Sequence, residues 1–103
     1  MPLSNIEKKK FRAIGHKLKP VVMIAQNGLS ENVGVELNRA LEDHELIKIK
    51  IAAGEREEKK ALALEICKEF HAECVQSVGH VILLYRQAKK QDPKLSNIKR
   101  RIA

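Results

Sequence analysis

One six-residue run, Leu46-Ile47-Lys48-Ile49-Lys50-Ile51, constrains the fold of this chain more than any other segment. Ile47, Ile49 and Ile51 alternate with Lys48 and Lys50, and a side-chain period of two is the period of a β-strand. The run therefore predicts a strand with one dry face and one face that meets water or a polyanion.

Helical and strand-like runs alternate around this strand. Ser4 and Glu7 match a capping box, and Gly79-His80 is a two-residue hairpin signal. We predict helices over residues 5–17, 30–43 and 55–70, and further strands over residues 21–24, 74–78 and 81–85. The order α-β-α-β-α-β-β predicts an α/β (α+β) fold with parallel or mixed pairing, closed by one antiparallel hairpin.

The 103 residues suffice for one domain with a single core, which we place at residues 1–87. Residues 88–103 are polar and basic, and Pro93 interrupts them. We expect a mostly flexible tail there, with a short helix around residues 96–101.

The net charge of +7 is unevenly distributed. Residues 1–19 carry six bases and one acid (+5), residues 20–85 seven bases and eleven acids (−4), and residues 86–103 seven bases and one acid (+6). Such segregation indicates a surface with a defined partner, although a basic helix face plus a solvated tail would also produce it.

Several functional classes find no support in the sequence. No apolar run approaches the ~20 residues of a membrane span, and no secretory signal is visible, so we expect a cytoplasmic protein. Cys67 and Cys74 lack the close spacing of zinc sites and are predicted to be buried, reduced thiols. No catalytic triad, dinucleotide fingerprint or P-loop is present. We therefore expect no enzyme, no metal and no cofactor.

A short polar loop between the strand ending at Ile24 and the helix beginning near Ser30 is the strongest candidate site. Gly28 sits where free backbone N–H groups and the positive end of a helix favour phosphate. Few aromatic side chains are available for base stacking, so recognition should depend on phosphates and RNA shape. The candidate RNA-binding residues are Ala25, Gln26, Asn27, Gly28, Lys8, Lys9, Arg12, Lys17, Lys19, Lys48, Lys50 and Arg86.

Three segments in one register, residues 18–30, 44–51 and 79–86, resemble the CRM domain, and more narrowly its small stand-alone bacterial members, the YhbY-like proteins. The resemblance covers about residues 2–86. It implies a four-stranded mixed sheet packed with three helices, similar to the C-terminal domain of translation initiation factor three. It also implies RNA binding through a GxxG loop. That loop corresponds to residues 25–28, where Ala25 replaces the usual first glycine.

The resemblance further implies association with large-subunit ribosomal RNA or its precursor particle. We expect a monomeric, non-catalytic RNA-binding protein that assists large-subunit assembly. The alternative is a protein–protein interaction module, in which the acidic middle of the chain meets a partner and the basic ends are incidental.

Overall fold

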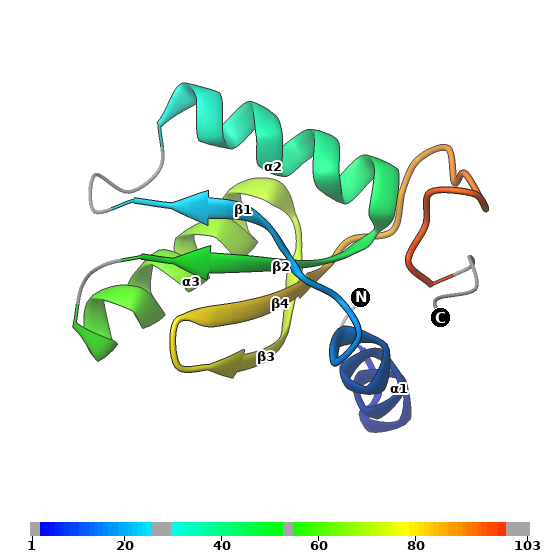
Figure 1. The fold of residues 1–103 in the computed structure, drawn as a ribbon, viewed down its shortest axis with the longest axis horizontal. Coiled ribbons are helices and arrows are strands. Elements are labelled where there is room, and N and C mark those ends of the chain that lie inside the picture. Colours follow the sequence, from blue (N-terminus) through cyan, green and yellow to red (C-terminus); the bar gives the residue numbers. More distant parts are fainter. Residues whose placement is uncertain (1–2, 26–29, 53–54, 99–103) are drawn as a thin grey trace.

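The computed structural model describes residues 3–25, 30–52 and 55–98 (Figure 1). It confirms the predicted order and number of elements within these residues. They are α1 (Asn5–Gly15), β1 (Pro20–Ile24), α2 (Glu31–His44), β2 (Leu46–Ile51), α3 (Arg56–Phe70), β3 (Glu73–Val78) and β4 (Val81–Tyr85).

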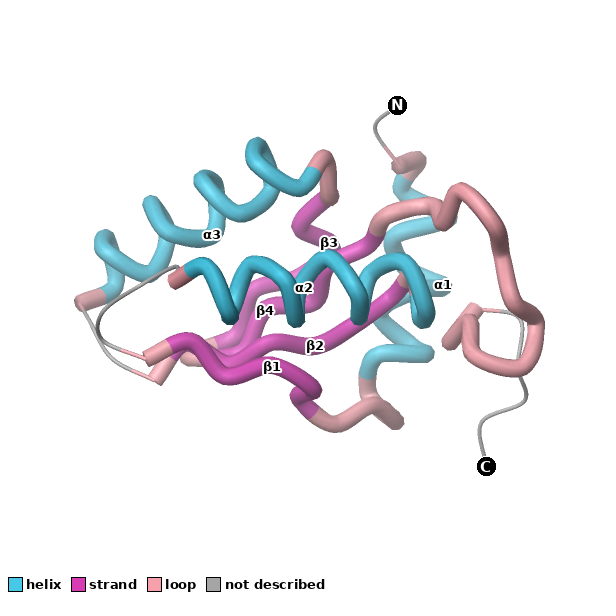
Figure 2. The backbone as a smooth tube through the Cα atoms, turned by 90° about the horizontal axis from the view of Figure 1, so that it is seen from above, coloured by secondary structure: helices cyan, strands magenta, loops and turns pink. Residues whose placement is uncertain are grey.

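The four strands form one mixed sheet in the order β1-β2-β4-β3. β1 pairs with β2 in parallel, whereas β2–β4 and β4–β3 are antiparallel. α2 and α3 cover one face of the sheet and α1 lies against the other (Figures 1 and 2). The predicted α+β class and mixed sheet are therefore confirmed.

The sheet separates two hydrophobic cores. Ile47, Ile49 and Ile51 belong to the larger core beneath α2 and α3, as their alternation predicts. Leu46 and Leu83 face the other way and meet Phe11 of α1 in a smaller core. Because α1 covers only part of that face, Lys48 stays half-buried and Lys50 exposed on the same side of β2.

Local signals place the helix starts correctly. The Ser4 hydroxyl accepts a hydrogen bond from the Glu7 N–H at 3.2 Å, and the Glu7 carboxylate accepts one from the Ser4 N–H at 3.3 Å. The Ser30 hydroxyl likewise accepts from the Val33 N–H at 3.2 Å. α1 ends at Gly15, two residues earlier than predicted, and a turn closed by hydrogen bonds from Lys17 and Leu18 N–H groups follows.

Residues 88–98 differ from the flexible tail that the sequence leads us to expect. Ala88, Ser96 and Asn97 are buried, and the segment is hydrogen-bonded to the junction between α2 and β2. Residues 96–98, the described part of the expected short helix, are not helical. The difference arises from Glu45, whose buried carboxylate accepts hydrogen bonds from this segment.

One further position differs from expectation. Cys74 is predicted to be buried but is exposed on the edge strand β3, whereas Cys67 is partly buried against the larger core.

Glu45 has a φ of 63°, a left-handed backbone conformation that L side chains rarely adopt. Among the described residues, no helix combines the length and the apolar character needed to cross a bilayer.

Candidate nucleic-acid interface

The predicted phosphate-binding loop begins at Ala25, which is exposed directly after β1. Gln26, Asn27 and Gly28 lie outside the described residues, so the predicted loop contact stays a prediction. The structure does describe what surrounds them, because Ile24 ends β1 and Ser30 caps α2.

The ends of three strands meet at this edge of the sheet. The Ala52 N–H donates to the Ile24 carbonyl and the Ile51 N–H to the His80 carbonyl, both at 2.8 Å. These bonds bring the ends of β1 and β2 beside the turn between β3 and β4. Both α2 and α3 begin at the same edge (Figure 2). Two helix N-termini therefore direct unpaired N–H groups and positive dipole ends toward it.

The side chains at this edge carry both signs of charge. Glu31 lies in the first turn of α2, and Glu57 and Glu58 lie in the first turn of α3 beside Arg56. The Glu55 side chain makes no capping hydrogen bond to α3. What the edge offers an anion is therefore backbone N–H groups, with the cationic side chains of Arg56 and Lys59 nearby.

A cluster of cationic side chains lies at the opposite end of β1. Lys17, Lys19 and Lys48, predicted separately from the sequence, line one pocket of about 290 Å³. We call it the lysine pocket. Its lining residues are Lys17, Leu18, Lys19, Val21, His44, Ile47, Lys48 and Asn97. The structure thus brings together three predicted residues that stand up to 31 positions apart (17 to 48) in the sequence.

The other predicted cations lie near this pocket or on the same face of the sheet. Lys8, Lys9 and Arg12 belong to α1, which covers that face, and Lys50 follows Lys48 on its exposed side. None of these four forms a salt bridge within the described residues. They remain available to a polyanion that approaches the α1 side of the molecule.

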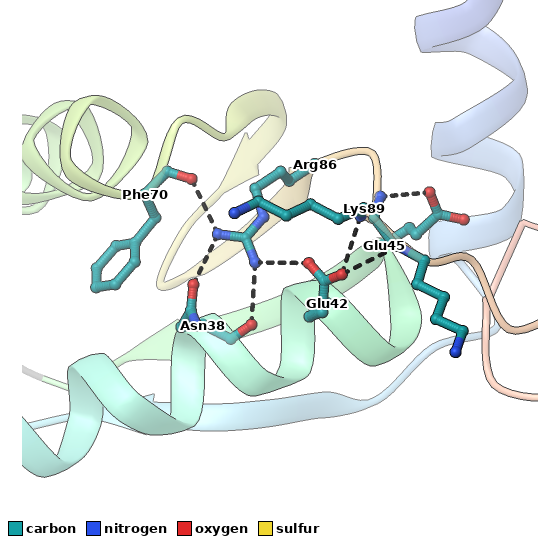
Figure 3. Close-up of polar contacts among 8 residues, drawn as sticks. Asn38, Glu42, Glu45, Phe70, Arg86 and Lys89 are labelled. Atoms are coloured by element: carbon teal, nitrogen blue, oxygen red, sulfur yellow. Dashed lines mark hydrogen bonds and ion pairs between the residues drawn. The ribbon is translucent and has the colours of Figure 1, made fainter.

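Arg86 occupies a different environment from the other candidates, as Figure 3 shows. Its guanidinium donates to the Asn38 side-chain oxygen at 2.9 Å, the Asn38 carbonyl at 3.1 Å and the Phe70 carbonyl at 3.2 Å. It also pairs with Glu42 at 3.4 Å, and its side chain is only 17% exposed. Arg86 therefore joins α2, α3 and the end of β4, on the side of the sheet away from α1.

Sequence reasoning missed the two other polar residues of the lysine pocket, His44 and Asn97. His44 ends α2 and Asn97 lies beyond the segment that resembles the CRM domain. The sequence signal for His44 is its position at the predicted end of a helix, two residues before the alternating strand. Nothing local marked Asn97, because its place depends on contacts with residues about 50 positions earlier.

The Cys67 thiol lies against the larger core. Burial, together with the nearby Cys74 and Glu73, raises the pKa of the Cys67 thiol to about 11, so the thiol stays protonated at neutral pH. Within residues 3–25, 30–52 and 55–98, no three His, Cys, Asp or Glu side chains gather in a way that could hold a metal ion.

Comparisons with known proteins extend over nearly the whole chain. The family model of the CRS1 / YhbY (CRM) domain matches residues 3–86. A Pseudomonas aeruginosa protein named "Probable RNA-binding protein" is 50% identical over 100 residues, covering 97% of this chain and 96% of its own. A Haemophilus influenzae protein named "RNA-binding protein" is 43% identical over 95 residues, covering 89% and 96%.

A solved structure shares the fold. The solution structure of a Staphylococcus aureus protein, described as "a putative RNA binding protein", superposes with a TM-score of 0.76 at 30% sequence identity. The match covers 86% of this chain and 93% of that one. Both the order of the elements and their arrangement in space are therefore common to the two proteins.

Proposed function

Because the chain belongs to the CRS1 / YhbY (CRM) domain family, we propose that it is a non-catalytic RNA-binding protein that contacts structured RNA. The observation that carries this proposal is the placement of the cationic side chains. Six predicted cations gather on α1, the connection after it and the adjoining face of β2: Lys8, Lys9, Arg12, Lys17, Lys19 and Lys48. A phosphate backbone is the polyanion that such a surface fits.

The loop at residues 25–28 would add a contact of a different kind. The helix N-termini at that edge favour an anion through backbone N–H groups, and Gly28 would let a phosphate approach closely. Ala25 replaces the first glycine of the GxxG pattern, but the second glycine, Gly28, is present. We assign the loop one phosphate of the bound RNA.

The physiological RNA in this proposal is large-subunit ribosomal RNA or its precursor particle in the cytoplasm, bound by a monomer that assists assembly. This assignment rests on the family resemblance. The names of the relatives support RNA binding in general.

The first experiment crosslinks the protein to RNA in growing cells and sequences the RNA recovered. Reads concentrated in one region of large-subunit ribosomal RNA, enriched in unprocessed ends, are the expected result. Diffuse reads over messenger and transfer RNAs would refute the assembly role and leave a general RNA binder. The absence of RNA above background would refute RNA binding itself.

A second experiment tests the loop with the purified protein. The Gly28→Asp variant puts a carboxylate where a phosphate would approach, so it should bind RNA about tenfold more weakly or worse without losing its fold. For about five phosphates, the logarithm of the wild-type association constant should fall with the logarithm of salt concentration at a slope of about −3.5 to −4.5. Equal affinity of the variant would exclude the loop as a contact.

One observation favours the second candidate, a protein-interaction module. A hollow between α2 and α3 is lined by three glutamates, Glu31, Glu65 and Glu69, against one arginine, Arg39, and this net negative charge would repel RNA and suit a basic protein segment. In that case a stable complex should survive nuclease treatment. A complex that dissociates with nuclease would exclude this candidate.

A further inference from the structure

The lysine pocket is built from three segments that are distant in sequence, residues 17–21, residues 44–48 and Asn97. Lys17, Leu18 and Lys19 come from the connection between α1 and β1, and Val21 comes from β1 itself. His44 ends α2, Ile47 and Lys48 belong to β2, and Asn97 comes from the segment after β4. A site assembled in this way exists only in the folded protein.

The charges around the pocket are uncompensated. Its lining includes three lysines but no aspartate or glutamate. Lys17, Lys19 and Lys48 take part in no salt bridge within the described part of the chain. Three like charges around one hollow repel one another, and an anion held between them would relieve that repulsion. By contrast, the hollow between α2 and α3 is lined by three glutamates and one arginine, so its net charge is negative.

The wall of the pocket is held in place by hydrogen bonds. The Asn97 N–H donates to the His44 carbonyl at 2.9 Å, and the Asn97 side-chain amide donates to the Leu46 carbonyl at 2.7 Å. His44 Nδ1 lies 2.8 Å from the Leu95 carbonyl, which can only accept, so this nitrogen carries the proton. A wall ordered before binding loses little conformational entropy when a ligand arrives.

We propose that the lysine pocket binds one phosphate group of the RNA backbone, as a contact separate from the loop at residues 25–28. This inference rests on the proposed RNA-binding function and names a second phosphate position for it. Lys17, Lys19 and Lys48 supply the ammonium groups, and the exposed Val21 beside them can contact the adjoining ribose.

The two phosphate positions lie at opposite ends of β1. From Lys19 to Ala25 the chain advances six residues, which corresponds to about 20 Å in extended strand geometry. A mononucleotide or a free phosphate cannot reach both positions, whereas a folded RNA can. The pocket would therefore favour an extended RNA backbone over small phosphorylated ligands.

The test compares two triple variants of the full chain. The first, Lys17→Gln with Lys19→Gln and Lys48→Gln, neutralises the pocket. The second, Lys68→Gln with Lys89→Gln and Lys90→Gln, removes the same charge from exposed lysines outside it. Thermal unfolding by circular dichroism verifies that both variants fold. A fluorescently labelled large-subunit ribosomal RNA transcript is the probe, titrated at several salt concentrations.

We expect the pocket variant to bind about tenfold more weakly than the control variant. Its salt slope should be shallower by about 0.7 to 0.9, the contribution of one phosphate. Equal affinity and equal slope for the two variants would overturn the inference while leaving RNA binding intact. Failure of the wild-type protein to bind the transcript would overturn the proposed function and this inference with it.

A second measurement distinguishes an RNA phosphate from a free one. Inorganic phosphate is titrated into the wild-type protein while the backbone amide NMR signals of Val21 and Lys48 are followed. If the pocket serves the RNA backbone, these signals should move only at phosphate concentrations far above those needed for RNA. Saturation at low phosphate concentration, with unchanged RNA affinity of the pocket variant, would assign the pocket to a free phosphate instead and overturn the inference.

Discussion

The Glu45 carboxylate and the Ser96 hydroxyl, 51 positions apart in the chain, form a 2.7 Å hydrogen bond in the protein interior. The same carboxylate accepts a hydrogen bond from the Ala88 N–H at 2.8 Å and another from the Gln91 side-chain amide. A buried carboxylate with several donors is stabilised by charge-assisted hydrogen bonds. Glu45 is therefore the main anchor of residues 88–98 on the domain.

Replacing Glu45 with alanine should lower the free energy of unfolding by about 3 kcal/mol, because several buried donors would lose their acceptor at once. Urea denaturation measures the loss. Trypsin should also cleave the variant faster after Lys94, which is exposed in the anchored segment. The Ser96→Ala variant removes one donor only and should lose about 1 kcal/mol. Equal stability of Glu45→Ala and wild type would show that the anchor contributes nothing.

Arg86→Gln should also lower the free energy of unfolding, by about 2 kcal/mol, because the guanidinium serves two carbonyls, an amide oxygen and the Glu42 carboxylate. Its RNA affinity, measured where the variant is folded, should equal that of wild type. Arg39→Gln is the matched control, since Arg39 is 84% exposed and pairs with Asp43 at 3.9 Å. The control should change stability by less than about 0.5 kcal/mol. Weaker RNA binding by folded Arg86→Gln would place this residue in the interface instead.

Two glycines should respond oppositely to alanine. A Cβ at Gly15 would lie 2.7 Å from a methyl carbon of the buried Leu83, so Gly15→Ala should cost about 1–3 kcal/mol of stability. A Cβ at Gly34 would lie 3.4 Å from the Phe70 ring, and alanine is the better helix former, so Gly34→Ala should gain about 0.5–1 kcal/mol. Thermal unfolding of both variants gives the comparison. A stabilised Gly15→Ala would mean that α1 is not seated closely on the sheet.

The raised pKa of Cys67 predicts a loss of stability at high pH. The folded protein retains this thiol proton up to about pH 11, whereas the unfolded chain releases it near pH 9.0. The contribution of the protonated Cys67 thiol to the free energy of unfolding is therefore complete below about pH 9 and is lost as the pH rises through about 11. The stability difference between wild type and Cys67→Ala should shrink over that range in urea denaturation, with thiolate absorbance at 240 nm reporting the titration. A constant difference would contradict the raised pKa.

Much of the fold could be predicted because its signals are local. The alternation of Ile47, Lys48 and Ile49 depends only on neighbouring residues, and the Ser4 capping box spans a single helical turn. Where the predictions differ from the structure, the cause lies far away in sequence. α1 ends at Gly15, which lies against Leu83, and residues 88–98 are ordered because Glu45 binds them.

For the candidate site, too, the sequence predicts some residues, whereas the pocket that they form depends on contacts between distant segments. Their positive charge is enough to predict Lys17, Lys19 and Lys48 as RNA-binding residues. Only the three-dimensional arrangement shows that they line one pocket. Charge alone also nominated Arg86, since a sequence does not reveal that Asn38 and Glu42 lie beside it. Asn97 could not be found, because an uncharged residue in a polar segment gives no signal.

The anchoring of residues 88–98 by Glu45 has a consequence for biosynthesis. A ribosome produces these residues after the four strands of the sheet, so the nascent chain can form its sheet before the Ala88 and Ser96 donors reach the Glu45 carboxylate. A chain truncated just after Tyr85 would keep the four described strands but lose the Ala88, Gln91 and Ser96 donors of a buried carboxylate. Residues 88–98 thus complete the fold last, by covering a carboxylate that the earlier elements have already placed.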